Sequence, residues 1–187
     1  GAIAEAFPQA NVMQATSSGC RPLPGTNGLE RCTTLRKWVF EEFLPDNSVD
    51  QIILGGRWRE SEMPFVDDTL STLASLTDRL VVIGPTVEYA GGVLPELLAR
   101  SILRNDTAFD FETLRTPGKE HVNELMRAAA VRNGATYIDV LSTECVEDGS
   151  CLLLAPDGMP MQFDYGHLTQ SGARFLVTQH RNELLGD

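Results

Sequence analysis

The residues best suited to chemistry form one short stretch near the C-terminal end, Asp164-Tyr165-Gly166-His167-Leu168-Thr169. Asp164 and His167 stand three residues apart, a spacing that fits a tight loop better than one face of a strand. In such a loop the carboxylate can fix the tautomer of the imidazole, and the imidazole can take a proton from a serine hydroxyl. The stretch therefore predicts part of a hydrolytic relay. The alternative is a capped loop in which both side chains are merely polar.

The residues after this loop predict an amphipathic helix. Ala173, Leu176, Val177, His180 and Leu184 recur at helical spacing. Thr169 directly precedes the run and is a suitable N-cap. We therefore expect the Asp164–His167 loop to lie at the start of the last helix.

Strand and helix patterns alternate through the rest of the chain. Strands are predicted at 12–16, 49–54, 80–83 and 136–141, and helices at 32–43, 67–80, 94–103 and 120–133. Residues 152–154 and 161–163 resemble a small hairpin. This alternation predicts an α/β fold with three layers, in which a doubly wound, mainly parallel sheet carries helices on both faces. No repeat or linker interrupts it, so one domain over residues 1–187 is expected.

Composition excludes several functional classes. The chain has 15 Lys and Arg against 26 Asp and Glu, a formal net charge of −11. Such an acidic chain is unlike nucleic-acid-binding proteins, because binding of phosphates requires clustered basic residues. No apolar run approaches the ~20 residues needed to cross a bilayer, and no signal peptide is recognisable.

Neither a metal site nor a cofactor site is expected. The three histidines, His121, His167 and His180, are isolated from one another in the sequence. The glycine pairs at 55–56 and 91–92 lack the spacing of a dinucleotide-binding loop.

The four cysteines fall into two local couples, Cys20 with Cys32 and Cys145 with Cys151. Neither couple has the short gap usual in zinc sites. Two disulfides within the couples are the simplest of three possible pairings, and they would indicate an oxidising compartment. Buried free thiols are the alternative.

Two further residues are candidates for contacts with a substrate oxygen. Gly19 lies in a loop of small residues, where its N–H could approach such an oxygen. Arg57 follows the predicted strand 49–54, at the end where α/β sheets place ligands. A simple turn glycine and a surface arginine stacked on Trp58 are the structural alternatives.

These motifs together resemble a known family. The Asp164-x-x-His167-Leu-Thr block, with Gly172-Ala173 after it, resembles the last block of the SGNH (GDSL-like) hydrolases. A narrower resemblance is to the extracytoplasmic SGNH domain fused to integral-membrane sugar O-acyltransferases (acyltransferase family three). It rests on three further segments: Ser18-Gly19-Cys20-Arg21-Pro22-Leu23, Ile53-Leu54-Gly55-Gly56-Arg57-Trp58, and the Cys145…Cys151 order before Asp164.

The resemblance implies a role for each candidate. His167 would be the general base, Asp164 its orienting carboxylate, and Gly19 an oxyanion donor through its backbone N–H. The wider superfamily has a Gly-x-Asn signature at its third block. Its asparagine is missing here, and Arg57 is the candidate substitute.

The first block of the family is absent. That block is a strand ending in Gly-Asp-Ser, and its serine is the nucleophile; this chain contains no Gly-Asp-Ser. Residues 1–7 resemble the last turns of the helix that should follow the serine. We therefore expect an SGNH/flavodoxin-like domain that is N-terminally incomplete and inactive by itself, lacking the first strand. A natural pseudoenzyme is the alternative.

For the intact parent, the resemblance implies an O-acyltransferase, most simply an acetyltransferase, that modifies a cell-surface glycan such as lipopolysaccharide O-antigen. Its partners would be the membrane domain of the same chain, an acyl donor and a glycan acceptor. Its location would be periplasmic or extracytoplasmic, tethered to the inner membrane. A secreted SGNH carbohydrate esterase is one alternative. A non-catalytic glycan-binding domain is another, with stacking surfaces from Trp58, Tyr89, Phe109, Phe111 and Tyr165.

Overall fold

The computed structural model describes residues 1–104, 110–146 and 149–186, and the chain divides into two compact units. The sheet unit comprises Met13–Pro85 and Glu120–Asp139. The terminal unit comprises Gly1–Val12, Thr86–Lys119 and Val140–Asp187, and so contains both chain ends. Phe109 lies outside the described residues.

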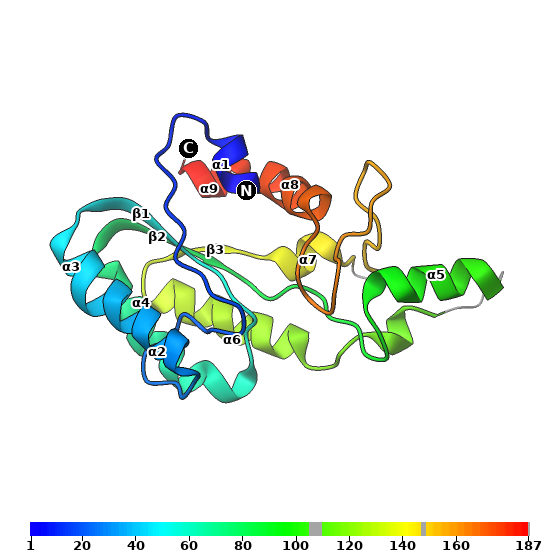
Figure 1. Ribbon diagram of the computed structural model, residues 1–187, viewed down its shortest axis with the longest axis horizontal. Helices are drawn as coiled ribbons and strands as arrows, with labels where there is room; N and C mark the ends of the chain where they lie inside the picture. Colours follow the sequence, from blue (N-terminus) through cyan, green and yellow to red (C-terminus); the bar gives the residue numbers. More distant parts are fainter. Residues whose placement is uncertain (105–109, 147–148, 187) are drawn as a thin grey trace. The chain divides into compact units, whose positions relative to one another are not determined.

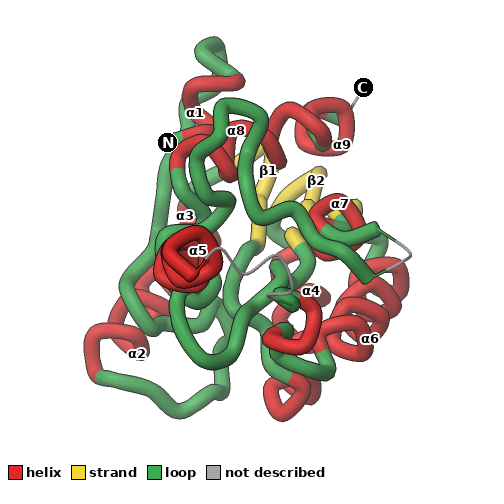
Figure 2. The backbone as a smooth tube through the Cα atoms, turned by 90° about the vertical axis from the view of Figure 1, so that its right-hand side faces the viewer, coloured by secondary structure: helices red, strands yellow, loops and turns green. Residues whose placement is uncertain are grey.

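The sheet unit is built on three parallel strands in the order β1 (Val49–Leu54), β2 (Thr77–Ile83) and β3 (Thr136–Ile138). Helix α4 (Val66–Ala74) lies in the connection from β1 to β2, and α6 (Lys119–Arg132) immediately precedes β3. Figure 2 shows the strands in yellow with both helices beside them. Parallel neighbours need such crossover connections, so the alternating pattern of the sequence is sufficient to specify this sheet.

A single apolar core joins the strands to these helices. Leu80 and Val82 alternate along β2 into this core, and Val81 between them is also fully buried. Because successive strand residues point to opposite faces, both faces of β2 are covered. The predicted α/β class, with a parallel sheet flanked by helices, is confirmed. The core includes Leu54 from β1, Val66, Leu70 and Leu73 from α4, and Val122, Met126, Ala129 and Ala130 from α6.

The remaining helices of the sheet unit lie in the connections before and after β1. Helix α2 (Glu30–Lys37) continues as a π-helical segment, η1 (Trp38–Phe43), and ends in the single turn α3 (Leu44–Asp46). A 3-10 segment, η2 (Glu60–Phe65), leads into α4.

The terminal unit is helical. It contains α1 (Ala2–Ala6), α5 (Leu94–Arg104), the 3-10 turn η3 (Glu112–Leu114), α7 (Val140–Glu144), α8 (Gln170–Gln179) and α9 (Arg181–Leu185). Helix α1 lies beside α8 (Figure 1), where Glu5 accepts a hydrogen bond of 2.8 Å from Arg174 Nε. The first residues of the chain are thus bound to its last helices. Among the described residues, no helix is both long and apolar enough to cross a membrane.

Four predicted elements are wrong in whole or in part. Residues 12–16 form no strand; Val12 and Met13 are 45% and 69% exposed. The helix predicted over 67–80 ends at Ala74, because Leu80 pairs with Ile52 in the sheet. The strand predicted over 136–141 stops at Ile138, and residues 140–144 form α7. The predicted hairpin is reduced to isolated bridges, such as Leu154 with Pro160.

Candidate functional site

The Asp164–His167 loop forms the contact that the sequence predicts. His167 Nδ1 lies 2.6 Å from Asp164 Oδ2. The other carboxylate oxygen, Oδ1, accepts hydrogen bonds from the backbone N–H of Gly166 at 3.0 Å and of His167 at 2.7 Å. One carboxylate therefore closes the turn and orients the imidazole at the same time. Because Nδ1 faces the carboxylate and therefore carries the ring proton, Nε2 is the nitrogen that can accept a proton.

The electrostatics of the pair favour a charged carboxylate. Partial burial, the largest single effect, acts to raise the pKa of Asp164. Hydrogen bonds from Gly166 and His167 together outweigh it and hold that pKa below its ordinary value. Asp164 thus remains an acceptor at neutral pH. The His167 side chain is 57% exposed and can be reached from solvent.

The loop is anchored at both ends. Phe163 N–H donates to the His167 carbonyl at 3.0 Å, and Thr169 N–H donates to the Met161 carbonyl at 2.9 Å. Thr169 also caps α8 as predicted, because its Oγ1 accepts from Gly172 N–H at 3.0 Å. A Cβ on Gly172 would lie 2.3 Å from the Met161 carbonyl oxygen, so any side chain there would displace the helix.

A buried ion pair packs against the loop at Gly166. Lys119 Nζ contacts Glu88 Oε1, and the two residues are 8% and 3% exposed. Gly166 packs against this pair, since a Cβ on Gly166 would lie 3.6 Å from Glu88 Cγ. The Glu88 carbonyl accepts from Thr116 N–H at 2.7 Å, which fixes the backbone of the same segment.

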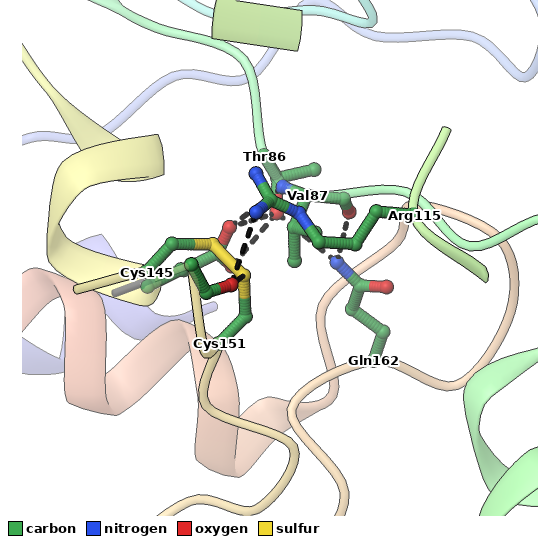
Figure 3. Close-up of a disulfide and its surroundings, with 8 residues drawn as sticks. Thr86, Val87, Arg115, Cys145, Cys151 and Gln162 are labelled. Atoms are coloured by element: carbon green, nitrogen blue, oxygen red, sulfur yellow. Dashed lines mark hydrogen bonds between the residues drawn. A yellow bond between two sulfur atoms is a disulfide. The ribbon is translucent and has the colours of Figure 1, made fainter. Parts of the chain in front are cut away.

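A second buried polar cluster fixes the residue that precedes the loop (Figure 3). Gln162 Nε2 donates to the Val87 carbonyl at 2.6 Å and to Thr86 Oγ1 at 3.1 Å. The Glu144 carboxyl accepts from Val87 N–H at 2.8 Å and bonds Thr86 Oγ1. Glu144 adjoins the Cys145–Cys151 disulfide, whose loop receives a 3.0 Å hydrogen bond from Arg115 to the Gly149 carbonyl.

Sequence patterns did not single out Glu88, Lys119, Glu144 or Gln162. Glu144 lies beside a cysteine and three residues after the end of a predicted strand, and these positions are the signal that the sequence offers. A carboxylate in that position can equally face solvent, and the partners that bury it come from distant segments.

Glu144→Gln is expected to change the pH dependence of stability. Burial raises the pKa of Glu144 to about 7, against hydrogen bonds from Thr86 and Val87 that lower it. Unfolded glutamate titrates near 4.5, so the folded state holds an extra proton between these values. The stability from this group is full below pH 4.5 and is lost as pH rises through 7. Urea unfolding should show the variant gaining roughly 3 kcal/mol on the wild type between pH 4.5 and 8.

Glu41→Gln, at an exposed position of η1, controls for the loss of one net charge. A difference between Glu144→Gln and wild type that stays constant over this pH range would contradict a buried, proton-binding Glu144.

The sheet unit holds the two other candidates, Gly19 and Arg57, together with the Cys20–Cys32 disulfide. Gly19 has a φ of +72°, so its turn requires glycine whether or not its N–H binds a substrate. Their two loops meet within the unit, because a Cβ on Gly56 would lie 3.2 Å from Pro22 Cδ. Oxyanion or substrate contacts for Gly19 and Arg57 stay predictions.

The aromatic residues divide into core and surface. Trp58 is 1% exposed, and its Nε1 donates to the Ile83 carbonyl at 2.7 Å. Tyr89 is 4% exposed. Both are therefore wrong as stacking surfaces for a ligand. Tyr165 is 43% exposed and remains a candidate.

The other two histidines each lie beside a polar side chain of another segment. His180 Nε2 lies 2.7 Å from Thr143 Oγ1 at the junction of α8 and α9. His121 is exposed on α6, 3.7 Å from Glu60. Across residues 1–104, 110–146 and 149–186, no group of three metal-ligating side chains is assembled.

Comparison with known proteins gives a family and a fold. The family model of the SGNH domain fused to AT3 domains matches residues 1–181. A solved structure, the periplasmic domain of a lipopolysaccharide acetyltransferase from Salmonella ser. Paratyphi A, is similar with a TM-score of 0.80 and 18% identity. The match covers 98% of this chain and 77% of that one. A search of curated proteins found no match.

The matched region includes the Asp164–His167 loop, the sheet and both disulfides. The family model spans nearly the whole chain, and the solved relative has the same fold. This chain belongs to the family of SGNH domains that are fused to AT3 domains.

Proposed function

We propose that this chain is the extracytoplasmic domain of an O-acyltransferase, most simply an O-acetyltransferase, that modifies a cell-surface glycan such as a lipopolysaccharide. The observation that carries the proposal is the 2.6 Å contact between Asp164 and His167 in a partly exposed loop. It occurs in a family of domains fused to membrane acyltransferases, and a similar fold belongs to a lipopolysaccharide acetyltransferase.

The chemistry is acyl transfer in two balanced steps. His167 Nε2 takes the proton of a serine hydroxyl as the serine oxygen attacks the acyl carbon of the donor, and the imidazolium then protonates the leaving group. An acceptor hydroxyl next gives its proton to Nε2 and attacks the acyl-enzyme. The serine oxygen leaves and recovers that proton. Water in place of the acceptor gives ester hydrolysis.

Two parts of this machinery come from the family resemblance alone. The nucleophilic serine is proposed to come from a Gly-Asp-Ser block N-terminal to the printed sequence, which contains none. The oxyanion of each tetrahedral intermediate is proposed to accept hydrogen bonds from Gly19 N–H and from Arg57. Each such donor is worth about 10²–10³ in rate.

The membrane domain of the same parent chain is the proposed partner, since the family is defined by fusion to AT3 domains. It would present the acyl donor to this domain. Two disulfides, Cys20–Cys32 and Cys145–Cys151, support an oxidising, extracytoplasmic location.

The test compares two lengths of the protein. Residues 1–187 alone should not turn over 4-nitrophenyl acetate above background, because a relay without its nucleophile loses most of its rate. The same chain extended upstream through the Gly-Asp-Ser block should hydrolyse the ester and transfer acetyl to a lipopolysaccharide-derived oligosaccharide. Robust turnover by the short chain would refute the assignment of the serine. An inactive extended chain that still binds the oligosaccharide would favour a glycan-binding domain.

A further inference from the structure

Two exposed aromatic rings flank the imidazole of His167. The Phe163 ring is stacked with it at a centroid distance of 5.7 Å and an interplanar angle of 18°. The Tyr165 ring lies at the same centroid distance, tilted by 60°. Phe163 is 57% exposed and Tyr165 is 43% exposed. Large aromatic side chains normally bury most of their surface, so two exposed rings beside one functional group require an explanation.

The backbone explains why three rings gather at one place. Phe163, Tyr165 and His167 occupy alternate positions, and the hydrogen bond from Phe163 N–H to the His167 carbonyl closes the turn between them. Asp164, between the rings, uses its carboxylate inside the turn. The loop thus satisfies its carboxylate with internal hydrogen bonds but leaves both aromatic rings largely exposed. Stability alone favours burial of such apolar rings.

We propose that Phe163 and Tyr165 form the subsite for the acceptor sugar, which they bind through the apolar face of a pyranose ring. The inference rests on the function proposed above. In the second step of the reaction the acceptor hydroxyl must lie within hydrogen-bond reach of His167 Nε2. The rest of the acceptor then extends past the rings that flank the imidazole.

The size and chemistry of the two rings favour the sugar over the acyl group. An acetyl group has two carbons and must be held at the serine and the oxyanion donors. A pyranose has one face of C–H groups and a rim of hydroxyls, so it matches an apolar ring surface beside a polar catalytic group. Tyr165 adds a hydroxyl, as is common where a binding surface is apolar in part and wet in part.

The decisive experiment measures transfer and hydrolysis in the full-length, serine-bearing protein. Phe163→Leu and Tyr165→Leu keep an apolar side chain but remove the flat ring. Each should raise the KM for a lipopolysaccharide-derived oligosaccharide acceptor about tenfold, the usual scale for a lost aromatic contact. The loss in transfer should exceed the loss in 4-nitrophenyl acetate hydrolysis by a similar factor, because the small ester does not use the subsite.

Trp38→Leu is the matched control. Trp38 is an equally exposed aromatic, at 42%, and lines an open surface depression of about 570 Å³ with Glu30, Arg31, Thr34 and Leu35. This variant should leave the acceptor KM unchanged. If Trp38→Leu raises the KM while the loop variants do not, the acceptor binds on α2 and the proposal is overturned.

Two other results separate this inference from the function itself. Equal losses in transfer and hydrolysis would mean that the rings only align His167, which overturns the subsite and leaves the enzyme intact. If the wild type neither hydrolyses nor transfers, the proposed function fails. Saturation-transfer NMR of the 1–187 chain with methyl glucopyranoside, methyl galactopyranoside and methyl rhamnopyranoside then tests the rings directly. Contact that disappears in Phe163→Leu/Tyr165→Leu supports the subsite, and no contact overturns it.

Discussion

In a serine-bearing version of this domain, His167→Ala should lower the kcat/KM for 4-nitrophenyl acetate by about 10³-fold, within the range known for loss of a general base. The expectation follows from geometry, because Nδ1 is held by Asp164 and the exposed ring offers Nε2 for proton transfer. Initial rates of ester hydrolysis, recorded under conditions where both proteins stay folded, provide the measurement. His121→Ala removes an exposed histidine from α6 and is the matched control.

Asp164→Asn should cause a loss of the same order, because an amide can donate to Nδ1 and so stabilise the wrong tautomer. The double variant His167→Ala/Asp164→Asn should have a kcat/KM no lower than that of His167→Ala, since the two residues act as one unit. Losses that multiply in the double variant would show that Asp164 acts elsewhere. An unchanged rate in His167→Ala would refute the proposed role of Asp164 and His167 in proton transfer.

Lys119→Met should destabilise the domain by about 3–5 kcal/mol, the usual cost of breaking a buried ion pair from one side. Both members are almost fully buried, and Glu88 would lose its lysine partner without gaining access to water. Urea unfolding at pH 7 gives the difference directly. Lys119→Met/Glu88→Gln removes the charge as well and should recover most of the loss.

Arg100→Met serves as the comparison for this pair. Arg100 and Glu96 form an exposed ion pair at 3.5 Å on α5, and such pairs contribute about 1 kcal/mol or less. Gly166 packs on Glu88, so Lys119→Met in the serine-bearing protein should also reduce ester hydrolysis. A Lys119→Met variant as stable as Arg100→Met would mean that the pair is open to solvent.

Together these variants separate two layers of the site. His167 and Asp164 are proposed to contact reacting groups or each other, whereas Glu88 and Lys119 hold the loop through the backbone at Gly166. The Glu144 cluster holds Gln162 in the same way. Lys119→Met should lower stability and activity together, whereas His167→Ala should lower activity alone.

Sequence patterns correctly predicted several features whose partners lie close together in the chain. The Asp164–His167 contact spans three residues, and the Thr169 cap spans three. The strand at 49–54 was predicted to the residue because it combines an apolar run with clear turn signals at both ends. Each disulfide likewise joins the nearest available cysteine.

Patterns failed where apolar residues satisfy two periods at once. Leu80 continues the helical spacing of α4, yet it also alternates with Val82 along β2, and pairing with β1 decides the outcome. At the other end of the sheet, β3 keeps only three residues because Val140 and Leu141 are buried in a helix instead.

The sequence by itself determined the fold class, the Asp164–His167 loop and its Thr169 cap, because short-range hydrogen bonds and apolar periodicity depend on neighbouring residues. Only the tertiary structure decided which polar groups are buried. Gln162 meets Val87 across 75 residues, and Lys119 meets Glu88 across 31. It also decided that Trp58 belongs to the core while Phe163 and Tyr165 stay in solvent. A residue type states what a side chain can bind, whereas burial depends on segments that are distant in the chain.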